Sequence, residues 1–224
     1  MFDPADTGIV RVMRMVEIFY SINGESSYAG FPFVIARTAG CNLDCSFCDT
    51  PHARSLSQGE EMTVEEVAAH ILRFGCPMVL LTGGEPLLQP EIPLLADRLL
   101  QKEFTVLLET NGSLPVESLD RKIVKVVDLK CPSSGMSDRI LWENLEALTS
   151  RDQIKFVVKN TGDLEWMHGV IKAHSLEQKA HILVSPVFDS ASLPEIAGFL
   201  MENRIRARIQ LQLHKYIWGK NAKR

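Results

Sequence analysis

The chain has 224 residues, 46% of them hydrophobic and 23% charged, with a net charge of −4 and a pI near 5.9. This length and apolar content are enough for one sizeable core, so a single domain over residues 1–224 is expected. The acidic balance argues against a nucleic-acid partner. No run approaches the ~18 apolar residues of a membrane span, and residues 1–10 do not resemble a signal peptide. We therefore expect no membrane partner and a cytoplasmic location.

Short runs of β-branched and aliphatic residues alternate with amphipathic stretches along the chain. An extra strand is predicted within residues 11–22. The strands predicted after it cover residues 33–37, 78–82, 104–109, 123–128, 154–158 and 181–185, with a last one at 208–213. The predicted helices cover residues 63–74, 91–102, 141–148, 164–174 and 193–203, and a Thr63–Glu66 capping box marks the start of the first.

Apolar strands that alternate with helices are typical of an α/β fold with a parallel sheet buried on both faces. About six βα units are too few for a closed eightfold barrel, so a partial (β/α)6-type barrel is expected, with its core at about residues 17–219. Sites in such folds lie at the C-terminal ends of the strands. The most distinctive segments fall there: a cysteine loop at 40–50, TGGEP at 82–86, ETNG at 109–112, KCPSSG at 130–135 and SPVF at 185–188.

Three of the five cysteines, Cys41, Cys45 and Cys48, follow a C-x3-C-x2-C spacing in GCNLDCSFCDT. A clustered, odd set without an export signal is typical of a metal site in a reducing compartment. Structural zinc would need a fourth protein ligand, for which His52 and Cys131 are candidates. The other interpretation is an iron–sulfur cluster with three irons held by thiolates and one left open for another ligand. The remaining cysteines, Cys76 and Cys131, are expected to be structural.

The cysteine loop, with Phe47 before its last cysteine, and the GGEP loop together resemble the radical S-adenosylmethionine superfamily. The resemblance implies a 4Fe–4S cluster on the three cysteines, with S-adenosylmethionine chelated by the open iron. Its cleavage gives a 5′-deoxyadenosyl radical, so no protein side chain is assigned a catalytic role. The cofactor-binding residues that the resemblance implies are Phe47, Cys48, Asp49, Gly83, Gly84, Glu85, Asp128, Leu129, Lys130, Ser185, Pro186, Val187 and Phe188.

The residue types of the GGE segment, residues 83–85, also indicate a ligand-binding loop. Gly83 and Gly84 allow the backbone to approach a ligand closely. Glu85 is expected to supply a negative acceptor near an ammonium group.

Four further features are similar to the 7-carboxy-7-deazaguanine synthase family: EIFYSINGE at 17–25, Arg37, CDT at 48–50 and QLQLHKYIWG at 210–219. The similarity implies conversion of 6-carboxy-5,6,7,8-tetrahydropterin into 7-carboxy-7-deazaguanine with loss of ammonia. That is a carbon–nitrogen lyase reaction of queuosine biosynthesis. The chain departs from the family at Asn23, where glutamine is common, and at residues 128–130, where S-P-K is common.

Arg37 offers a planar fork suited to the substrate carboxylate. The other expected substrate-binding residues are Ile22, Asn23, Gly24, Thr82, Glu109 and His214. The resemblance also implies that Thr50 ligates Mg2+, which completes its octahedron with substrate oxygens and water.

The same resemblance implies a flavodoxin-like electron donor and a homodimer. Two alternatives stay open at this stage. One is a radical enzyme that generates a glycyl radical on a partner protein, and the other is a zinc-stabilised binding module.

Overall fold

The computed structural model describes residues 11–190 and 192–219, which build a single nine-stranded sheet in the order β3-β1-β2-β4-β5-β6-β7-β8-β9. The strands are β1 (Val12–Ile22), β2 (Pro32–Thr38), β3 (Glu60–Thr63), β4 (Met78–Gly83), β5 (Thr105–Thr110), β6 (Val124–Asp128), β7 (Gln153–Val158), β8 (His181–Pro186) and β9 (Ala207–Ile209). β1 pairs antiparallel with β2 and β3, and every other neighbouring pair is parallel. The predicted α/β fold with an extra N-terminal strand is confirmed.

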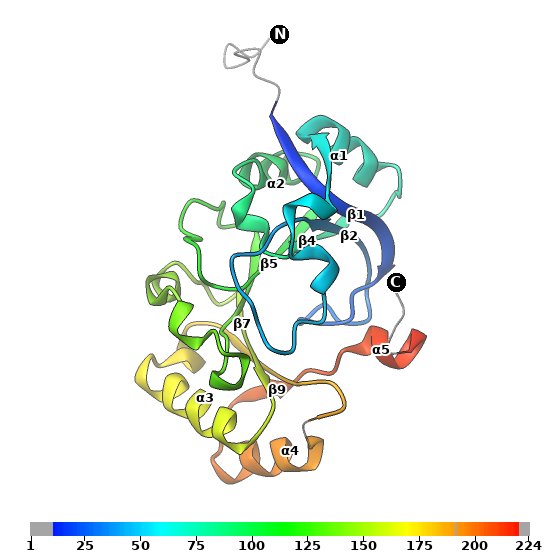
Figure 1. Ribbon diagram of the computed structural model, residues 1–224. Coiled ribbons are helices and arrows are strands. Elements are labelled where there is room, and N and C mark those ends of the chain that lie inside the picture. The colour runs from blue at the N-terminus through cyan, green and yellow to red at the C-terminus, as the bar shows by residue number, and fades with distance from the viewer. Residues whose placement is uncertain (1–10, 191, 220–224) are drawn as a thin grey trace.

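The helices are α1 (Val64–Leu72), α2 (Ile92–Gln101), α3 (Thr161–Ala173), α4 (Leu193–Glu202) and α5 (Leu213–Trp218). Figure 1 shows α1 and α2 together beside the first strands and α3 and α4 beside the last ones. Each pair covers its own hydrophobic core, and the two cores hold most of the buried apolar side chains of the described residues. These cores bind the helices to the outer face of the sheet.

A third, smaller core fills the concave face of the sheet. Its buried members are Phe33, Ile35, Leu80, Leu107 and Val124. Successive strand residues point to opposite faces, so residues two positions further along a strand stay on the same face. The concave face therefore continues beyond this core to the C-terminal ends of the same strands.

Three predicted site residues occupy that continuation. Arg37 follows Ile35 by two residues and is paired with Thr82 in the register of β2 and β4. Glu109 likewise follows Leu107 on β5. Strand periodicity and register thus bring these side chains to one end of the concave face, above its apolar core.

Thr63 is the N-cap of α1, and the capping box with Glu66 is formed in both directions. Its hydroxyl accepts from the Glu66 amide at 3.1 Å, and the Glu66 carboxylate accepts from the Thr63 amide at 2.8 Å. The predicted start of this helix is confirmed.

The predicted helix over 141–148 is wrong, because this segment forms only a short 3-10 helix, Trp142–Glu146. The Asn144 side chain donates to the Gly112 and Leu114 carbonyls at 3.1 and 2.9 Å and accepts from the Val116 amide at 3.0 Å. These hydrogen bonds of the buried Asn144 side chain tether the segment to the β5–β6 connection.

The last predicted strand, 208–213, is also only partly right. β9 ends at Ile209, and the Leu213 amide donates to the Gly24 carbonyl at 2.9 Å as α5 begins. The short edge strand β3 was missed, since EEMT carries no strand signal in its composition.

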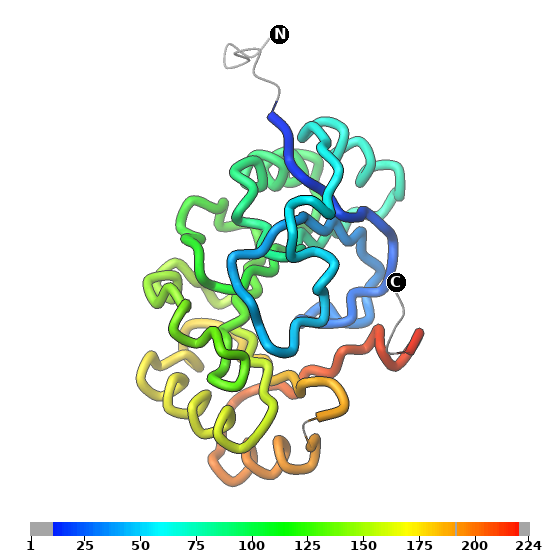
Figure 2. The backbone as a smooth tube through the Cα atoms, viewed as in Figure 1, coloured from blue at the N-terminus to red at the C-terminus, as the bar shows by residue number. Residues whose placement is uncertain are grey.

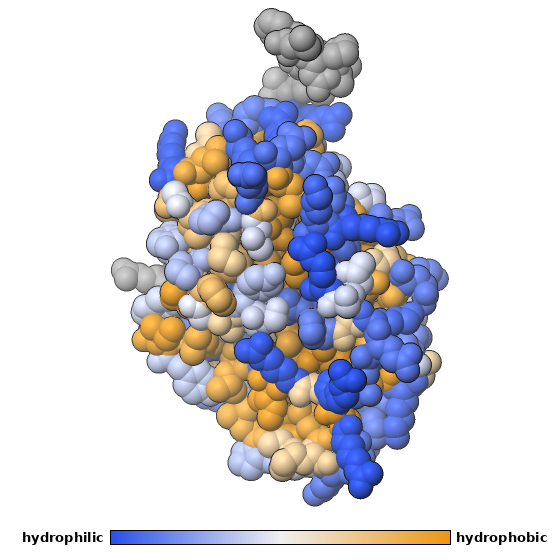
Figure 3. Space-filling view, turned by 180° about the vertical axis from the view of Figure 1, so that it is seen from behind, coloured by the Kyte–Doolittle hydropathy of each residue, from blue (hydrophilic) through white to orange (hydrophobic). Residues whose placement is uncertain are grey.

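Within the described residues no helix is both long and apolar enough to cross a membrane. Polar and apolar side chains are interspersed on the face shown in Figure 3.

Candidate active site

The three clustered cysteines lie on the loop that follows β2, and each thiol is half-buried. Cys41 Sγ accepts from the Leu43 amide at 3.5 Å and from the Asn111 side-chain amide at 3.8 Å. Such N–H···S contacts are typical of the surroundings of iron–sulfur ligands. Burial raises the pKa of Cys41 and of Cys45, so without a metal these thiols are protonated at neutral pH.

The GGE segment packs directly against the cysteine loop. A Cβ on Gly83 would lie 2.3 Å from Thr38 Oγ1, and one on Gly84 would lie 2.2 Å from the Gly40 carbonyl oxygen. The Glu85 amide donates to that same carbonyl at 2.8 Å. The two glycines are therefore required for the close contact between the loops after β2 and β4.

Glu85 does not face open space. Its side chain is fully buried and accepts from Thr110 Oγ1 at 2.8 Å, the Asn111 amide at 2.7 Å and the Leu87 amide at 3.0 Å. Burial raises its pKa. What the structure shows is a brace between the loops after β4 and β5, and a direct contact of this carboxylate with the cofactor stays a prediction.

The loop after β6 supports the cysteine loop from the other side. Ser46 donates through its amide to the Ser134 carbonyl at 3.0 Å and through its hydroxyl to the Ser133 carbonyl at 2.9 Å. The Ser133 amide in turn donates to Asp163 Oδ1 at 3.0 Å. The cysteine loop is thus held between two loops of the C-terminal rim, as Figure 2 allows the reader to follow.

A cluster of buried and half-buried charged side chains lies on the concave face beside this rim. Lys155 of β7 forms ion pairs with Glu25 at 2.7 Å, with Glu109, and with Asp128 at 3.5 Å. Lys130 adds a second ammonium group 2.9 Å from Asp128. Predicted substrate and cofactor residues therefore meet in one electrostatic network.

The carboxylates of this network have different proton affinities. Burial raises the pKa of Glu109, and the charge of Lys155 only partly opposes it. Burial acts in the same direction on Asp128, but Lys130 and Lys155 outweigh it and hold the pKa of Asp128 below its ordinary value. Asp128 is therefore charged at neutral pH.

Of the four buried side-chain atoms without a hydrogen-bond partner among the described residues, three lie near the same rim: Asp128 Oδ1, Ser185 Oγ and Gln210 Oε1; the fourth is Ser21 Oγ. Buried polar atoms are nearly always paired in folded proteins, so these atoms mark places for the donors of a bound molecule. Two of them belong to the stretches predicted to bind the adenosyl part of the cofactor. Together with the three half-buried thiols, they fit a cluster and S-adenosylmethionine.

Arg37 is not isolated on its strand. Its Nε donates to Glu17 Oε1 at 2.7 Å, and His52 Nε2 lies 3.6 Å from the same oxygen. This bond uses one edge of the guanidinium group and fixes its orientation. Glu17 lies opposite Arg37 in the antiparallel register of β1 and β2.

The segment expected to offer backbone groups to the substrate is largely occupied by the fold. The Asn23 amide donates to the Phe31 carbonyl and its carbonyl accepts from Gly30, both at 2.8 Å. Ile22 is the last residue of β1. His214 lies against Gly24, where a Cβ would come within 1.9 Å of His214 Nδ1. Burial lowers the pKa of His214, so the ring is neutral at neutral pH.

The segment around α5 covers the rim. Gln212 Nε2 donates to Asp49 at 2.9 Å and to Glu25 at 2.8 Å. Lys215 Nζ lies 3.7 Å from Asp49 and 5.0 Å from the centre of the Phe188 ring. These contacts connect the cysteine loop, the loop after β1 and the loop after β8.

For four other predicted site residues, the structure shows contacts within the protein that do not point to a ligand. The Leu129 side chain lies in the helix-side core, and its amide donates to the Lys155 carbonyl at 2.8 Å. Pro186 ends β8, and the Val187 amide donates to Val158 at 2.8 Å. The Thr50 hydroxyl donates to Asp49 at 3.0 Å. Contacts of these residues with a cofactor or an ion remain predictions.

Several residues of the site were not predicted one by one: Glu17, Glu25, Asn111, Lys155, Gln212 and Lys215. A signal for Lys155 was present, since it is the one charged residue in the apolar strand QIKFVV. A charge in the middle of a buried strand indicates a partner or a ligand on the same face.

Among the described residues, no three His, Cys, Asp or Glu side chains are arranged to hold a single metal ion. Cys131 and Cys76 are buried, as expected for structural cysteines.

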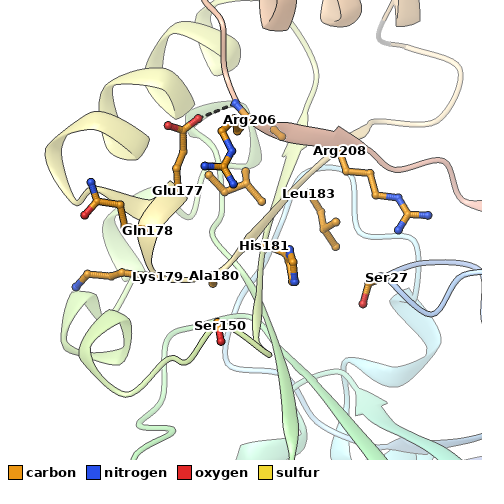
Figure 4. Close-up of a pocket in the computed structure, with 12 residues that line it drawn as sticks. Ser27, Ser150, Glu177, Gln178, Lys179, Ala180, His181, Leu183, Arg206 and Arg208 are labelled. Atoms are coloured by element: carbon orange, nitrogen blue, oxygen red, sulfur yellow. Dashed lines mark hydrogen bonds between the residues drawn. The ribbon is translucent and has the colours of Figure 1, made fainter.

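A separate hollow lies elsewhere on the described part of the chain. It has a volume of about 480 Å³ and includes His181, Arg206 and Arg208 in its lining, as Figure 4 shows. His181 begins β8, so this hollow opens at the opposite end of the strands from the cysteine loop. It contains none of the predicted site residues.

Comparisons with known proteins give a consistent picture. A family model described as the radical SAM superfamily matches residues 35–132. The 7-carboxy-7-deazaguanine synthase of Chlorobaculum tepidum is 39% identical, with 94% of this chain and 96% of the relative covered. That of Methanospirillum hungatei is 42% identical, with 92% and 85% covered. A crystal structure of QueE from Escherichia coli shares the fold, with a TM-score of 0.76 at 23% identity over 91% of this chain and 95% of that chain.

These relatives cover more than nine tenths of the chain, and the residues matched by the superfamily model include its cysteine loop. The chain belongs to the 7-carboxy-7-deazaguanine synthase family, within the radical SAM superfamily.

Proposed function

We propose that this protein is a 7-carboxy-7-deazaguanine synthase that converts 6-carboxy-5,6,7,8-tetrahydropterin into 7-carboxy-7-deazaguanine with loss of ammonia. This makes it a carbon–nitrogen lyase of queuosine biosynthesis. The observation that carries the proposal is the meeting of the cysteine loop, Arg37 and the buried carboxylates at one rim, in a chain whose curated relatives have this name.

The bound cluster and S-adenosylmethionine supply the radical that removes hydrogen from the substrate. The protein's share is binding and orientation. Cys41, Cys45 and Cys48 would hold the cluster, and the backbone of Gly83 and Gly84 would receive the methionyl end of the cofactor. Asp128 and Ser185 carry the unpaired buried oxygens that suit its hydroxyl and amino groups.

Arg37 would bind the substrate carboxylate through the edge of its guanidinium group that faces away from Glu17. Glu109 would accept from the N–H groups of the pterin, and the neutral His214 ring would face the same ligand. Thr82 completes the wall next to Arg37.

We further propose that Mg2+ joins Thr50 and the substrate. A neutral hydroxyl is a weak ligand, so the ion should bind tightly only with substrate oxygens present. Thr50→Ala should lower turnover and remove most of the stimulation by added Mg2+, whereas Thr50→Ser should retain much of both. Product formation is measured against Mg2+ concentration at saturating substrate. An unchanged Mg2+ dependence in Thr50→Ala would place the ion elsewhere.

A flavodoxin-like donor and a homodimer belong to this proposal as well, by family likeness. A cytoplasmic location is supported by the free thiols, which need a reducing compartment.

The proposal is tested with anaerobically reconstituted, reduced protein. It is incubated with S-adenosylmethionine, Mg2+ and the carboxytetrahydropterin, and the deazaguanine is identified by mass spectrometry. We expect product that depends on S-adenosylmethionine and is absent in Cys45→Ala. If S-adenosylmethionine is cleaved but no deazaguanine forms, the superfamily reaction would still be supported, but the proposed substrate would be contradicted.

A further inference from the structure

We propose that Lys155 is a positioning residue, whose ammonium group holds Glu25 and Glu109 side by side as charged acceptors for the N–H edge of the substrate. This inference rests on the proposed function. It assigns a role in substrate binding to Lys155, and it gives Glu25 a role beside Glu109.

The location of Lys155 supports this role. It lies on β7 between Ile154 and Phe156, whose side chains belong to the helix-side core, so Lys155 points to the concave face. In the register it is paired with Asp128 on β6. Its side chain is 7% exposed. An ammonium group this deep is stable only with charged partners.

Lys155 joins parts of the chain that no backbone pairing joins. Glu25 comes from the loop after β1, at 2.7 Å, and Glu109 comes from β5. Gln212 holds the other oxygen of Glu25 at 2.8 Å. Two carboxylates that would otherwise repel each other are thus fixed next to one ammonium group.

The chemistry of the ligand fits such a pair. The pyrimidine ring of a pterin presents a ring N–H and an amino group side by side, as a guanidine does. Ionised carboxylates are strong acceptors for such donors. A protonated carboxyl group would offer a competing donor instead.

Lys125 provides a matched control. It is the other deeply buried lysine of an ion pair, 3.3 Å from Asp152, and both side chains are at most 2% exposed. It lies on β6 next to Val124, at the end of the strand away from the rim. Lys125→Met therefore removes the same kind of buried ion pair without touching the charge cluster.

The direction of the pH effect follows from the groups that face Lys155. These are Glu25, Glu109, Asp128 and, more distantly, Lys130 and Asp49. Glu109 is already harder to ionise because it is buried, and Glu25 and Asp128 add negative charge beside it. Removing Lys155 takes away the main opposing charge, so the pKa of Glu109 rises further.

The experiment compares Lys155→Met, Lys155→Arg and Lys125→Met with the parent, all loaded with cluster and S-adenosylmethionine. Binding of the carboxytetrahydropterin is measured by anaerobic calorimetry, and kcat/KM is measured against pH. For Lys155→Met we expect the carboxytetrahydropterin to bind at least about 30-fold more weakly. We also expect the acid limb of the kcat/KM profile to move upward by about 1–3 pH units. Lys155→Arg should restore much of both.

Lys125→Met should lower thermal stability but leave binding and the acid limb as in the parent. If Lys155→Met behaves in the same way, Lys155 is structural only and the inference is wrong. Carboxyl titration by NMR of 13C-labelled glutamate gives an answer that does not depend on the substrate. A Glu109 carboxyl group that titrates alike in the parent and in Lys155→Met overturns the inference. This holds even if the parent turns over no pterin, an outcome that by itself would contradict only the proposed function.

Discussion

Two buried acidic residues of the rim, Glu85 and Asp128, show how neighbours set the charge of a side chain. Glu85 has hydroxyl and backbone donors as direct partners, and burial raises its pKa. Asp128 has two ammonium groups, which lower its pKa despite burial. Its contribution to stability is therefore present above the pKa of an unfolded aspartate and is lost as the pH falls through the lower folded value.

At the cysteines, we expect each of Cys41→Ala, Cys45→Ala and Cys48→Ala to abolish assembly of the cluster. The proposed cluster has these three thiolates as its only protein ligands, so the loss of any one leaves a second iron without a protein ligand. Cys76→Ala is the control, because Cys76 is buried at the start of β4, far from the rim. Iron and acid-labile sulfide are measured after anaerobic reconstitution. Full iron content in any of the three variants would overturn the ligand assignment.

At Arg37, we expect Arg37→Lys to weaken substrate binding by about 2–5 kcal/mol. Lysine keeps the charge but loses the fork that Glu17 orients. Affinity for S-adenosylmethionine should stay unchanged, since Arg37 is not among its expected partners. Both affinities are measured by calorimetry, and an equal loss of both would indicate a damaged fold instead of a lost carboxylate contact.

Among the helices, α1 is stabilised at its first turn by the capping box of Thr63 and Glu66. Thr63→Ala should destabilise the protein by about 1 kcal/mol, because the Glu66 amide loses its acceptor. Thr63→Ser keeps the hydroxyl and should recover most of the loss. Denaturant unfolding checks both variants. A Thr63→Ala protein as stable as the parent would mean that the packing of α1 alone fixes its start.

The strands and helices that were predicted correctly combine a clear period with a clear end signal. β4 and β5 are continuous apolar runs, and α1 has its capping box. The elements that were missed depend on partners distant in sequence. β3 exists because β1 pairs with it, and α5 begins where the Leu213 amide meets Gly24.

The same distinction holds for the site. Cysteine spacing and the GGE glycines were visible because their chemistry is local in the sequence. The contacts that Lys155 and Gln212 make with Glu25 were not, since more than a hundred positions separate each of these residues from Glu25. Only the curvature of the sheet brings the loop after β1 to β7.

For the molecule as a whole, the contact between Gly24 and His214 holds the C-terminal segment against the start of the chain. Gly24→Ala should push the His214 ring out of place, because the new Cβ would come within 1.9 Å of Nδ1. We expect turnover to fall about 100-fold with little loss of stability. Gly169→Ala in α3 is the control, since nothing lies within 4 Å of its added Cβ.

A second comparison separates this mechanism from general damage. His214→Ala alone should reproduce the loss, and the double variant should lose no more than either single one, because both changes act through the same ring. Losses that add in the double variant would show that Gly24 acts separately from His214. Turnover and thermal unfolding are measured for all four proteins.

The segment from Gln210 to α5 is also the last part of the described rim to be synthesised. Its residues emerge from the ribosome after all nine strands, because chains are made from the N-terminus onward. Until then the loop that holds Cys41 lacks the cover that Gln212 and Lys215 supply through Asp49. We therefore expect the three thiols to be more accessible to iron and sulfide in a nascent chain than in the finished protein.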